Sequence, residues 1–399
     1  MPSRIPFNKP FLVGKELDYI AEAIHTGNVA SDGHFTQACA QLLETRFGIG
    51  KVILTPSGTA ALEMAAMLCD FEPGDEVIMP SFTFSSTANA VIGCGAKPVF
   101  VDLRPDTLNL DESLIEAAIT PRTRAIMPVH YAGVGCEMDE IMRLAEARGL
   151  LVIEDAAQAV NAFYGGKALG AIGQLGAYSF HYTKNYLCGE GGALTVNAPD
   201  LIERADIIRD KGTNRRQFLR GEVDKYTWVD IGASCAPSEI VCAFLYAQLE
   251  QMDAISRRRR EIYDLYYNRL EPLAREGLLA LPTIPDKCES NYHLFYVLLP
   301  TAAARDGLMA HLQTQGIQAV FHYVPLHASP FGKRFGDWAL PATDELSARL
   351  LRLPFFNDLT AAEQIEVIEQ VTAFLKQTPA QPRRQPLVFT AGQPEEPAP

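Results

Sequence analysis

Residues 150–160, LLVIEDAAQAV, decide the fold class that the sequence predicts. Four apolar residues, Leu150–Ile153, form a candidate buried strand, and the carboxylates of Glu154 and Asp155 follow directly. Ligands of open α/β sheets bind beyond the carboxyl ends of the strands, so an acidic residue here is placed to meet a ligand. Taken alone, the stretch favours the simpler interpretation, in which Asp155 caps the following helix.

Similar short apolar runs alternate with helical patterns over the first two-thirds of the chain. The expected strands are Lys51–Thr55, Glu76–Met79, Pro98–Asp102, Arg124–Val129, Leu150–Ile153 and Gly192–Val196. Amphipathic or alanine-rich segments such as Ala60–Leu68 and Asp139–Arg148 lie between several of them. The alternation predicts an α/β domain with a mainly parallel sheet that helices cover on both faces.

The pattern changes at about Pro237, where Pro237-Ser238-Glu239 is a typical helix start. Apolar periodicity continues toward Tyr267, as one long helix or two in succession, and the arginine run Arg257–Arg260 is expected on a solvated helix face. A smaller α+β domain should follow. Its expected strands are Ser290–Leu299 and Ala319–Val324, and its expected helices are Leu346–Leu353 and Ala361–Leu375.

Length and composition bound the domain count and the partners. A chain of 399 residues is too long for one small core, so we expect an N-terminal arm and large domain over 1–250, a small domain over 251–376 and a disordered tail over 377–399. The net charge of −13 argues against nucleic acid or an anionic membrane as the main partner. No apolar run approaches the ~20 residues of a membrane span, and the first residues lack a signal core, so the expected location is the cytoplasm.

Residues 57–59, Ser-Gly-Thr, stand between a predicted strand and an alanine-rich helix. Glycine lets the backbone approach an anion closely, and a helix N-terminus offers free N–H groups and a favourable dipole. The hydroxyls of Ser57 and Thr59 would add donors, although plain helix capping explains the same residues equally well. Phe82 and Phe84 follow the next strand two positions apart, where aromatic residues are more often core than ligand platform.

Residues 179–194, SFHYTKNYLCGEGGAL, contain Lys184, whose side chain suggests one ligand for all of these motifs. Lys184 lies among Phe180, Tyr182 and Tyr186, and a lysine is rarely buried unless it is paired or chemically used. Desolvation lowers the pKa of such an amine and makes it nucleophilic toward carbonyls. The lysine, the strand-end carboxylate, the anion cradle and the aromatic ring together predict pyridoxal phosphate as the cofactor.

This cofactor gives each motif a role. Lys184 would hold the aldehyde as a Schiff base, Asp155 would keep the ring nitrogen protonated, and Gln158 would hydrogen-bond the ring hydroxyl. Phe84 would cover the ring by offset stacking, which stabilises by ~0.5–1.5 kcal/mol beyond burial. The glycines of Gly189–Gly192 would make room for backbone beside the lysine. The phosphate would be bound by Ser57, Gly58, Thr59 and Ser179.

Four stretches together resemble a known family. SGTAAL, PGDEVIMPSFTF, EDAAQ and SFHYTKNYLCGEGGAL are similar to motifs of the DegT/DnrJ/EryC1/StrS sugar aminotransferases, and the resemblance extends from about Ile5 to about Leu375. It implies an aspartate-aminotransferase-like fold, that of fold type I pyridoxal phosphate enzymes. KGTNRRQFLRGEVDKYTWVDIG and FHYVPLH resemble one subgroup in particular. That likeness implies transfer of an amino group, usually from glutamate, to C4 of dTDP-4-keto-6-deoxyglucose, giving dTDP-4-amino-4,6-dideoxygalactose for enterobacterial common antigen or another surface glycan.

The resemblance also implies a homodimer with active sites at the subunit interface. Many members carry an asparagine that reaches the partner's cofactor phosphate where this chain has Ser234, whose hydroxyl can also donate. Arg215 or Arg216 would approach the diphosphate of the nucleotide sugar across that interface. The expected sugar contacts are His322, Tyr323 and His327, with His181 either bordering the pocket or simply packing. No metal site is predicted, because the two histidines 322 and 327 form a weak spacing and the eight cysteines include no Cys-x-x-Cys pair.

The residue roles and the resemblance agree on a two-stage transamination. Lys184, displaced by glutamate, would move the proton as general base and acid, while Asp155 holds the pyridinium. No arginine can be assigned to the carboxylate of the donor. Three alternatives stay open: a UDP-linked or 3-keto sugar as substrate, a sugar dehydratase (a branch that carries histidine in place of the lysine), and a non-enzymatic pyridoxal-binding sensor.

Overall fold

Seven short strands form one sheet in the computed structural model, which describes residues 3–377. Their order is β1-β9-β8-β5-β4-β2-β3. They span Lys51–Thr55 (β1), Glu76–Pro80 (β2), Lys97–Val101 (β3), Thr123–Ile126 (β4), Leu151–Asp155 (β5), Leu175–Ser179 (β8) and Gly192–Val196 (β9). Strands β3, β2, β4, β5 and β8 are parallel, whereas β9 runs antiparallel to β8 and β1. The predicted α/β fold with a mainly parallel sheet is therefore confirmed.

All six predicted strands overlap strands of this sheet, but β8 was not predicted. Its sequence, Leu-Gly-Ala-Tyr-Ser, contains no β-branched residue and no alternation of polar and apolar side chains, although all five residues are buried. A central strand covered on both faces needs no polar side, so the usual pattern is absent. The predicted tail over 377–399 lies outside the described residues, except for Gln377.

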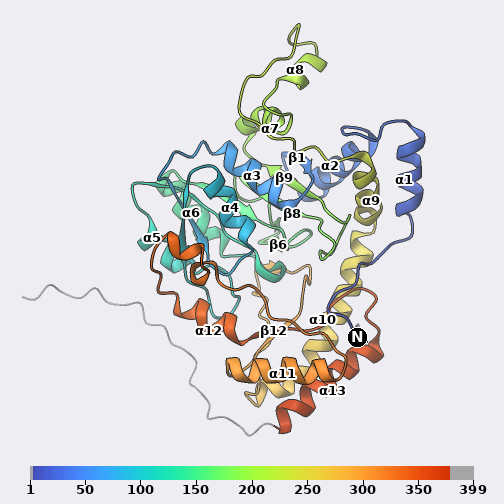
Figure 1. Ribbon diagram of the computed structural model, residues 1–399, viewed down its shortest axis with the longest axis vertical. Coiled ribbons are helices and arrows are strands. Elements are labelled where there is room, and N and C mark those ends of the chain that lie inside the picture. The colour runs from blue at the N-terminus through green and yellow to red at the C-terminus, as the bar shows by residue number, and fades with distance from the viewer. Residues whose placement is uncertain (1–2, 378–399) are drawn as a thin grey trace, which may run out of the picture.

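Helices cover both faces of the sheet (Figure 1). Alternate side chains of β1 enter different cores: Val52 and Leu54 pack with α1, α2, α6 and α9, whereas Ile53 packs with α3, α4 and α7. The bounds of these helices are Glu16–His25 (α1), His34–Phe47 (α2), Gly58–Leu68 (α3), Ser85–Gly93 (α4), Met138–Arg148 (α6), Ile202–Arg209 (α7) and Glu239–Glu250 (α9). The short elements α5 (Ile115–Ala118), β6 (Phe163–Tyr164) and β7 (Lys167–Ala168) lie in connections.

Two helices in succession lead out of this layer, because α9 and α10 (Met252–Arg275) meet at Gln251 (Figure 1). A separate hydrophobic cluster unites α10 with α11 (Ala302–Thr314), α13 (Ala361–Gln377) and strands β11 (Tyr296–Leu298) and β12 (Leu350–Arg352). Ile5 joins this cluster and forms a bridge with Ile317. We place the boundary between the large and the small domain at 250/251, where the two helices meet, as a proposal.

Three expectations for the C-terminal part are wrong in detail. Leu346–Leu353 is not one helix, since α12 (Pro341–Arg349) ends where β12 begins. Ala319–Val324 contributes a single bridge, from Val320 to Arg352. Of the predicted strand Ser290–Leu299, only β11 forms, and the two-residue strand β10 (Cys288–Glu289) lies just before that range in the sequence. A three-residue strand such as β12 carries no periodicity that a sequence could display.

The arginine run of α10 was expected on a solvated helix face, but one of its four members is buried. Arg259 is buried, and its guanidinium donates to the carbonyls of Tyr292 and His293 and to Oδ1 of Asn357. Its guanidinium carbon also lies 4.7 Å from the ring centroid of Phe355. Burial lowers the pKa of Arg259, and arginine nevertheless stays charged, so this side chain is a structural cation inside the protein.

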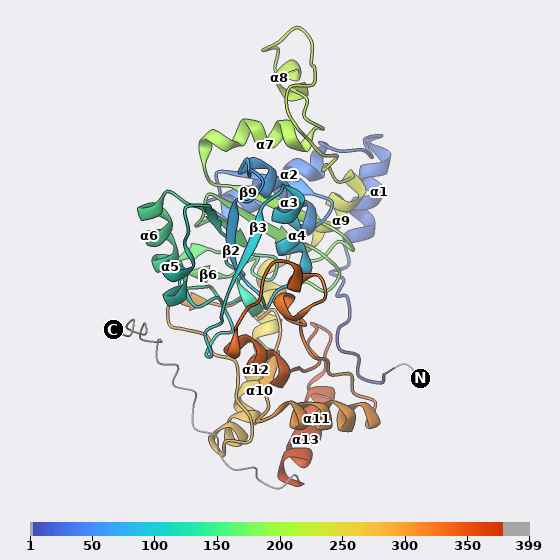
Figure 2. The same ribbon diagram turned by 60° about the vertical axis from the view of Figure 1, so that its left-hand side comes forward.

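Residues 211–234 project from the large domain beyond α7 (Figures 1 and 2). We call this segment the arm; it is not the N-terminal arm of the sequence analysis. It contains a short helix, α8 (Arg215–Leu219). Asn214 closes its base, because its side chain and backbone exchange hydrogen bonds with Thr227. Among residues 3–377, no helix is both long and apolar enough to cross a membrane.

Candidate active site

The predicted anion cradle lies at the N-terminus of α3. Ser57 caps the helix, accepting a hydrogen bond from the Ala60 N–H at 3.1 Å, so the capping interpretation is correct. The cap uses Oγ as an acceptor, which leaves its own hydrogen free for an anion. The N–H groups of Gly58 and Thr59 belong to the first turn, where no intrahelical carbonyl is available to them. Capping and anion binding are thus compatible at this site.

Two glycines bring the pieces of the cradle together. A Cβ on Gly58 would lie 2.9 Å from Cβ of Ser179, so the glycine allows the helix start to lie against the end of β8. A Cβ on Gly192 would lie 2.4 Å from the carbonyl of Ser57. The glycine-rich turn therefore makes room for the cradle backbone, whereas the sequence had suggested room beside the lysine itself.

Asp155 ends β5 and is held in place by its neighbours. Its Oδ2 accepts a hydrogen bond from Oγ1 of Thr87 at 2.7 Å, and its Oδ1 accepts one from the Ala157 N–H at 3.2 Å. The preceding residue, Glu154, is fully buried and pairs with Nε2 of His130 at 2.9 Å. The same carboxylate accepts hydrogen bonds from the backbone N–H groups of Gly170, Ile172 and Gly173. The position of the Asp155 carboxylate is thus fixed by the strand, by α4 and by this buried anchor.

Lys184 follows β8 in a turn that its own N–H closes onto the carbonyl of His181 at 2.8 Å. Burial lowers the pKa of the Lys184 amine to about 8, although the Asp155 carboxylate acts in the opposite direction. The nearby guanidinium of Arg352 lowers it further. At such a pKa an appreciable fraction of the amine is neutral near pH 7, which is the nucleophilic form.

Aromatic side chains from both domains border this region. Phe84 immediately precedes α4, and its ring is 60% exposed and 6.4 Å from the ring of Tyr323. Tyr323 stacks on His322 at 3.7 Å, and its hydroxyl accepts a hydrogen bond from Nε2 of Gln158 at 2.9 Å. Oε1 of Gln158 accepts from the Ala132 N–H. Phe84 is free to cover a planar ring, whereas Gln158 already bonds within the protein.

His322 is buried beside the same tyrosine and is tied to the large domain. Its Nδ1 lies 2.8 Å from the hydroxyl of Tyr131, a residue that precedes it by 191 positions. Burial lowers the pKa of His322 well below its usual range, and Arg352 and Lys184 act in the same direction. His322 is therefore neutral, and it joins the small domain to the site.

Sequence reasoning missed three residues of this site. Thr87 binds Asp155, Arg352 places a guanidinium near Lys184, and His293 bonds to the neighbouring Asn185. Thr87 follows Phe84 by one helical turn, a spacing that could have revealed it. Arg352 was assigned to a predicted helix, and His293 reaches the site only through a contact between residues 108 positions apart.

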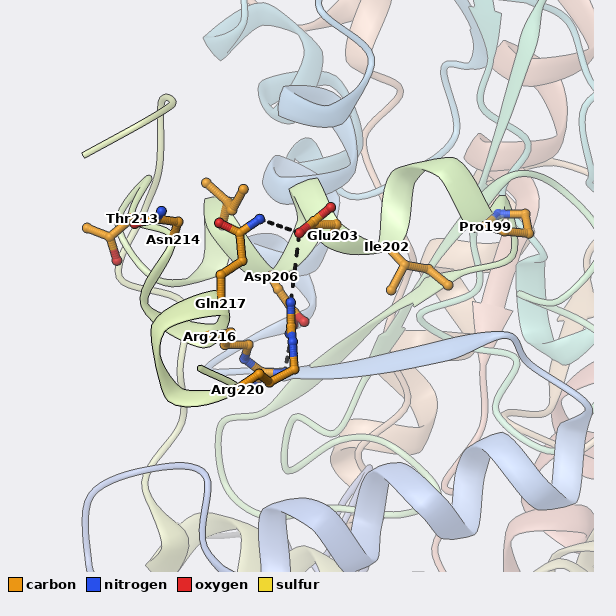
Figure 3. A pocket seen from close by; sticks show the side chains of 10 residues that line it. Pro199, Ile202, Glu203, Asp206, Thr213, Asn214, Arg216, Gln217 and Arg220 are labelled. Atoms are coloured by element: carbon orange, nitrogen blue, oxygen red, sulfur yellow. Dashed lines mark hydrogen bonds and ion pairs between the residues drawn. The ribbon is translucent and has the colours of Figure 1, made fainter. Parts of the chain in front are cut away.

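Three residues that were predicted to contact the substrate or the partner's cofactor, Arg215, Arg216 and Ser234, belong to the arm. Arg216 belongs to the arm and pairs with Asp206 at 2.8 Å and with Asp32 at 3.0 Å, beside a cavity of about 280 Å³ between α7 and α8 (Figure 3). Arg215 is exposed on the same helix, and Ser234 is exposed at the end of the arm. The residues that line this cavity include no predicted cofactor residue, so it is separate from the region around Lys184.

The remaining two histidines are bonded within the protein. His327 is buried, with Nδ1 at 2.7 Å from Oγ of Ser81 and Nε2 at 3.2 Å from Asp344. His181 bonds to Thr183 through Nδ1 and lies 3.5 Å from Glu190 through Nε2. Both ring nitrogens of His327 are therefore used. Burial lowers the pKa of His181, and the charge of Lys184 acts in the same direction.

These residues fit pyridoxal phosphate. The free N–H groups at the start of α3 suit a phosphate, a buried carboxylate suits a pyridinium, and a desolvated amine suits an aldehyde. The exposed ring of Phe84 is available to cover the cofactor ring.

Comparisons with known proteins agree with this assignment. The model of the DegT/DnrJ/EryC1/StrS aminotransferase family matches residues 11–372. GDP-perosamine synthase from Caulobacter vibrioides is 35% identical over 387 residues, covering 94% of this chain and 98% of that protein. The pleiotropic regulatory protein of Geobacillus stearothermophilus is 36% identical over 324 residues, covering 80% and 84%.

Solved structures extend the likeness to three dimensions. DesV from S. venezuelae, whose structure holds a ketimine intermediate, superposes with a TM-score of 0.85 at 32% identity, covering 95% of this chain and 100% of that one. Other matching structures hold pyridoxal phosphate or pyridoxamine phosphate. The predicted fold and cofactor are thereby confirmed.

Proposed function

Because the chain belongs to the DegT/DnrJ/EryC1/StrS aminotransferase family, and is a pyridoxal-phosphate-dependent sugar aminotransferase, we propose that it aminates C4 of dTDP-4-keto-6-deoxyglucose. The product would be dTDP-4-amino-4,6-dideoxygalactose, with glutamate as the amino donor. The observation that carries the reaction class is the buried Lys184 of lowered pKa beside the carboxylate of Asp155. The choice of sugar is supported by the stretches 211–232 and 321–327, which resemble one subgroup.

Different residues of this chain have different roles in the proposed reaction. The cofactor, when bound, supplies an electron sink for the carbon that loses or gains a proton. The amine of Lys184, whose pKa of about 8 lies close to neutral pH, would take the proton from one of the two carbons bonded to the transferred nitrogen and return it to the other. Asp155 holds a positive ring nitrogen, and Ser57, Gly58, Thr59 and Ser179 hold the phosphate.

Arg352 is the residue that we assign to the carboxylate of the amino donor. Its Nη2 donates to the Phe321 carbonyl at 3.0 Å, but its buried Nε has no hydrogen-bond partner among the described residues. Its charge acts on Lys184, His322 and Tyr323, which supports its inclusion among the site residues. A guanidinium with a free donor matches the geometry of a carboxylate.

Replacing this arginine tests the assignment. Arg352→Met should raise the KM for glutamate by about 10- to 100-fold, since a charge-assisted hydrogen bond contributes about 1.5–3 kcal/mol. The KM for the keto sugar should change little. Steady-state kinetics with each substrate varied provides the measurement. Arg349→Met is the matched control, because Arg349 pairs with Glu345; an unchanged KM for glutamate in Arg352→Met would contradict the assignment.

A second copy of the chain is the proposed partner, with active sites at the interface between the copies. The arm exposes a group of large apolar side chains: Phe218, Leu219, Tyr226, Trp228, Val229 and Ile231. Several exposed large apolar side chains on one segment are typical of interaction surfaces. Arg216 is already paired with three aspartates, Asp32, Asp206 and Asp210, whereas Arg215 makes no ion pair with any described residue. Of the two arginines, Arg215 is therefore the better candidate for the partner's substrate diphosphate.

A panel of nucleotide sugars tests the proposed substrate. Purified enzyme and glutamate would be supplied with dTDP-, UDP- and GDP-linked 4-keto-6-deoxy sugars and with a 3-keto isomer, and products identified by NMR. We expect kcat/KM for the dTDP-linked 4-keto sugar to exceed the others at least tenfold, and amination at C4. The GDP-linked substrate is included because a relative is a GDP-perosamine synthase. A preference for the GDP- or UDP-linked sugar would overturn the substrate assignment and leave the reaction class intact.

A further inference from the structure

A chain of two buried hydroxyls at the start of α4 ends on the carboxylate of Asp155. Oγ1 of Thr87 donates to Oδ2 of Asp155 at 2.7 Å, and the same Oγ1 lies 2.7 Å from Oγ1 of Thr83. All three side chains are buried, with Thr87 fully inaccessible to solvent and Thr83 only 3% exposed. The three oxygens therefore form a continuous hydrogen-bonded line inside the protein.

The number of protons fixes the direction of this chain. An ionised carboxylate can only accept hydrogen bonds, and a threonine hydroxyl has a single proton to donate. Thr87 gives its proton to Asp155, so the bond between the two threonines must use the proton of Thr83. Each hydroxyl polarises the next one toward the carboxylate, which strengthens the last bond. The other carboxylate oxygen, Oδ1, accepts a longer bond, from the Ala157 N–H at 3.2 Å.

The backbone of α4 determines where Thr87 lies. The helix starts directly after Phe84, whose carbonyl accepts a hydrogen bond from the Thr87 N–H at 3.2 Å. Phe84 and Thr87 are three positions apart, which is about one helical turn. Between them, Oγ of Ser86 lies 2.7 Å from Oγ1 of Thr59 in the anion cradle. One turn of one helix therefore contacts the cradle, holds the carboxylate and carries the aromatic ring that is free to cover a cofactor.

We propose that Thr87, oriented by Thr83, is a positioning residue that keeps the carboxylate of Asp155 charged and in place as the counter-charge of the cofactor's ring nitrogen. Hydrogen bonds to a carboxylate stabilise its charged form, so the proton stays on the ring nitrogen, where it helps the ring to accept electrons. Both threonines act only through Asp155. The inference rests on the proposed role of Asp155 and adds the two side chains on which that role depends.

Thr87→Val tests the proposal, because valine keeps the shape of the side chain and removes only the hydroxyl. The buried Oδ2 of Asp155 would lose its donor, and losing a hydrogen bond to a charged group corresponds to a factor of about 10 to 100. We expect the dissociation constant for pyridoxamine phosphate, measured by fluorescence titration of the cofactor-free enzyme, to rise about tenfold. Thr87→Ser keeps the hydroxyl and should bind pyridoxamine phosphate like the wild type.

Nitrogen-15 NMR of enzyme loaded with ring-labelled pyridoxal phosphate reports the protonation of the ring nitrogen directly. In the wild type we expect a protonated nitrogen at neutral pH, and in Thr87→Val a shift of the signal toward the unprotonated value. Thr83→Val leaves the bond from Thr87 to Asp155 in place, so it should shift the signal in the same direction but by less. The loss in kcat should follow the same order and reach about 10- to 100-fold in Thr87→Val.

Thr343→Val is the matched control. Oγ1 of Thr343 donates to Oδ1 of the buried Asp102, also at 2.7 Å, so the substitution removes the same kind of bond. Neither residue bonds to a predicted cofactor residue. This variant should lose stability to thermal unfolding without a change in the ring-nitrogen signal or in the affinity for pyridoxamine phosphate.

Three results would overturn the proposal: an unchanged signal and affinity in Thr87→Val, a Thr87→Ser variant as impaired as Thr87→Val, or equal effects in Thr87→Val and Thr343→Val. The last would mean that the loss of any buried hydroxyl bond loosens the site. If Thr87→Val does not fold, Thr83→Val supplies the test, and an unshifted ring-nitrogen signal in that variant overturns the proposed chain. Failure of the proposed function would appear differently, as a borohydride-stable cofactor label on a residue other than Lys184 in the wild type.

Discussion

Lys184→Ala is expected to abolish turnover, with a loss on the order of 10⁴-fold or more, the upper end of what a positioned acid–base group supplies. The variant removes both the covalent attachment point of the cofactor and the only described amine that is buried beside Asp155 with its pKa lowered to about 8. Binding of pyridoxamine phosphate should persist, because the cradle at Ser57 and the carboxylate of Asp155 are unchanged. Product formation and fluorescence titration with pyridoxamine phosphate measure the two effects separately.

Lys167→Ala serves as the control, since Lys167 is an exposed lysine of β7. Borohydride reduction of the wild type followed by peptide mapping should place the cofactor on Lys184 directly. Substantial turnover by Lys184→Ala, or a cofactor label elsewhere, would refute the assignment of the lysine and with it the mechanism. Loss of pyridoxamine phosphate binding would instead indicate that the lysine also supports the shape of the site.

Sequence reasoning succeeded where a motif and its structural context are local. Ser57 and Gly58 stand between a strand and a helix, and Asp155 ends an apolar strand, so each could be placed at the carboxyl edge of a sheet from its immediate neighbours. In both places the plainer interpretation, helix capping, could not be separated from ligand binding. The structure explains why for Ser57: the oxygen caps the helix, and the hydrogen remains for an anion. For Asp155 the capping interpretation is wrong, because β5 is followed by a turn and β6 and not by a helix.

The parts that sequence reasoning missed depend on distant contacts. His293 meets Asn185 across 108 positions, and His322 meets Tyr131 across 191. No local pattern marks either pair, because each contact joins segments that lie far apart in the sequence. The same holds for Arg259, whose position in a run of four arginines suggested solvent, although its face of α10 packs against the carbonyls of 292 and 293. A run of charged residues can be assigned to a helix from the sequence, but the sequence does not show which of these residues faces the protein interior.

Asp155→Asn is the second variant for which we expect a large effect, a loss of about 10²- to 10⁴-fold in kcat/KM. The substitution keeps the shape of the side chain, and Oγ1 of Thr87 can still hydrogen-bond to it, so only the charge is removed. A buried positive ring nitrogen would then lack its counter-charge, and breaking a buried ion pair from one side costs about 3–5 kcal/mol. The ring would lose its proton more readily and accept electrons less well.

The same variant has a readout that needs no cofactor. The carboxylate of Asp155 raises the pKa of Lys184, opposing burial, so its neutralisation should move that pKa further below 8 in the cofactor-free enzyme. Acylation of Lys184 would then begin at lower pH. Asp139→Asn is the control, because Asp139 forms an exposed pair with Lys287 and such pairs contribute little. Activity within tenfold of the wild type, together with an unchanged pKa of Lys184, would show that Asp155 only holds the turn after β5, through the Ala157 N–H, and is not the partner of the ring.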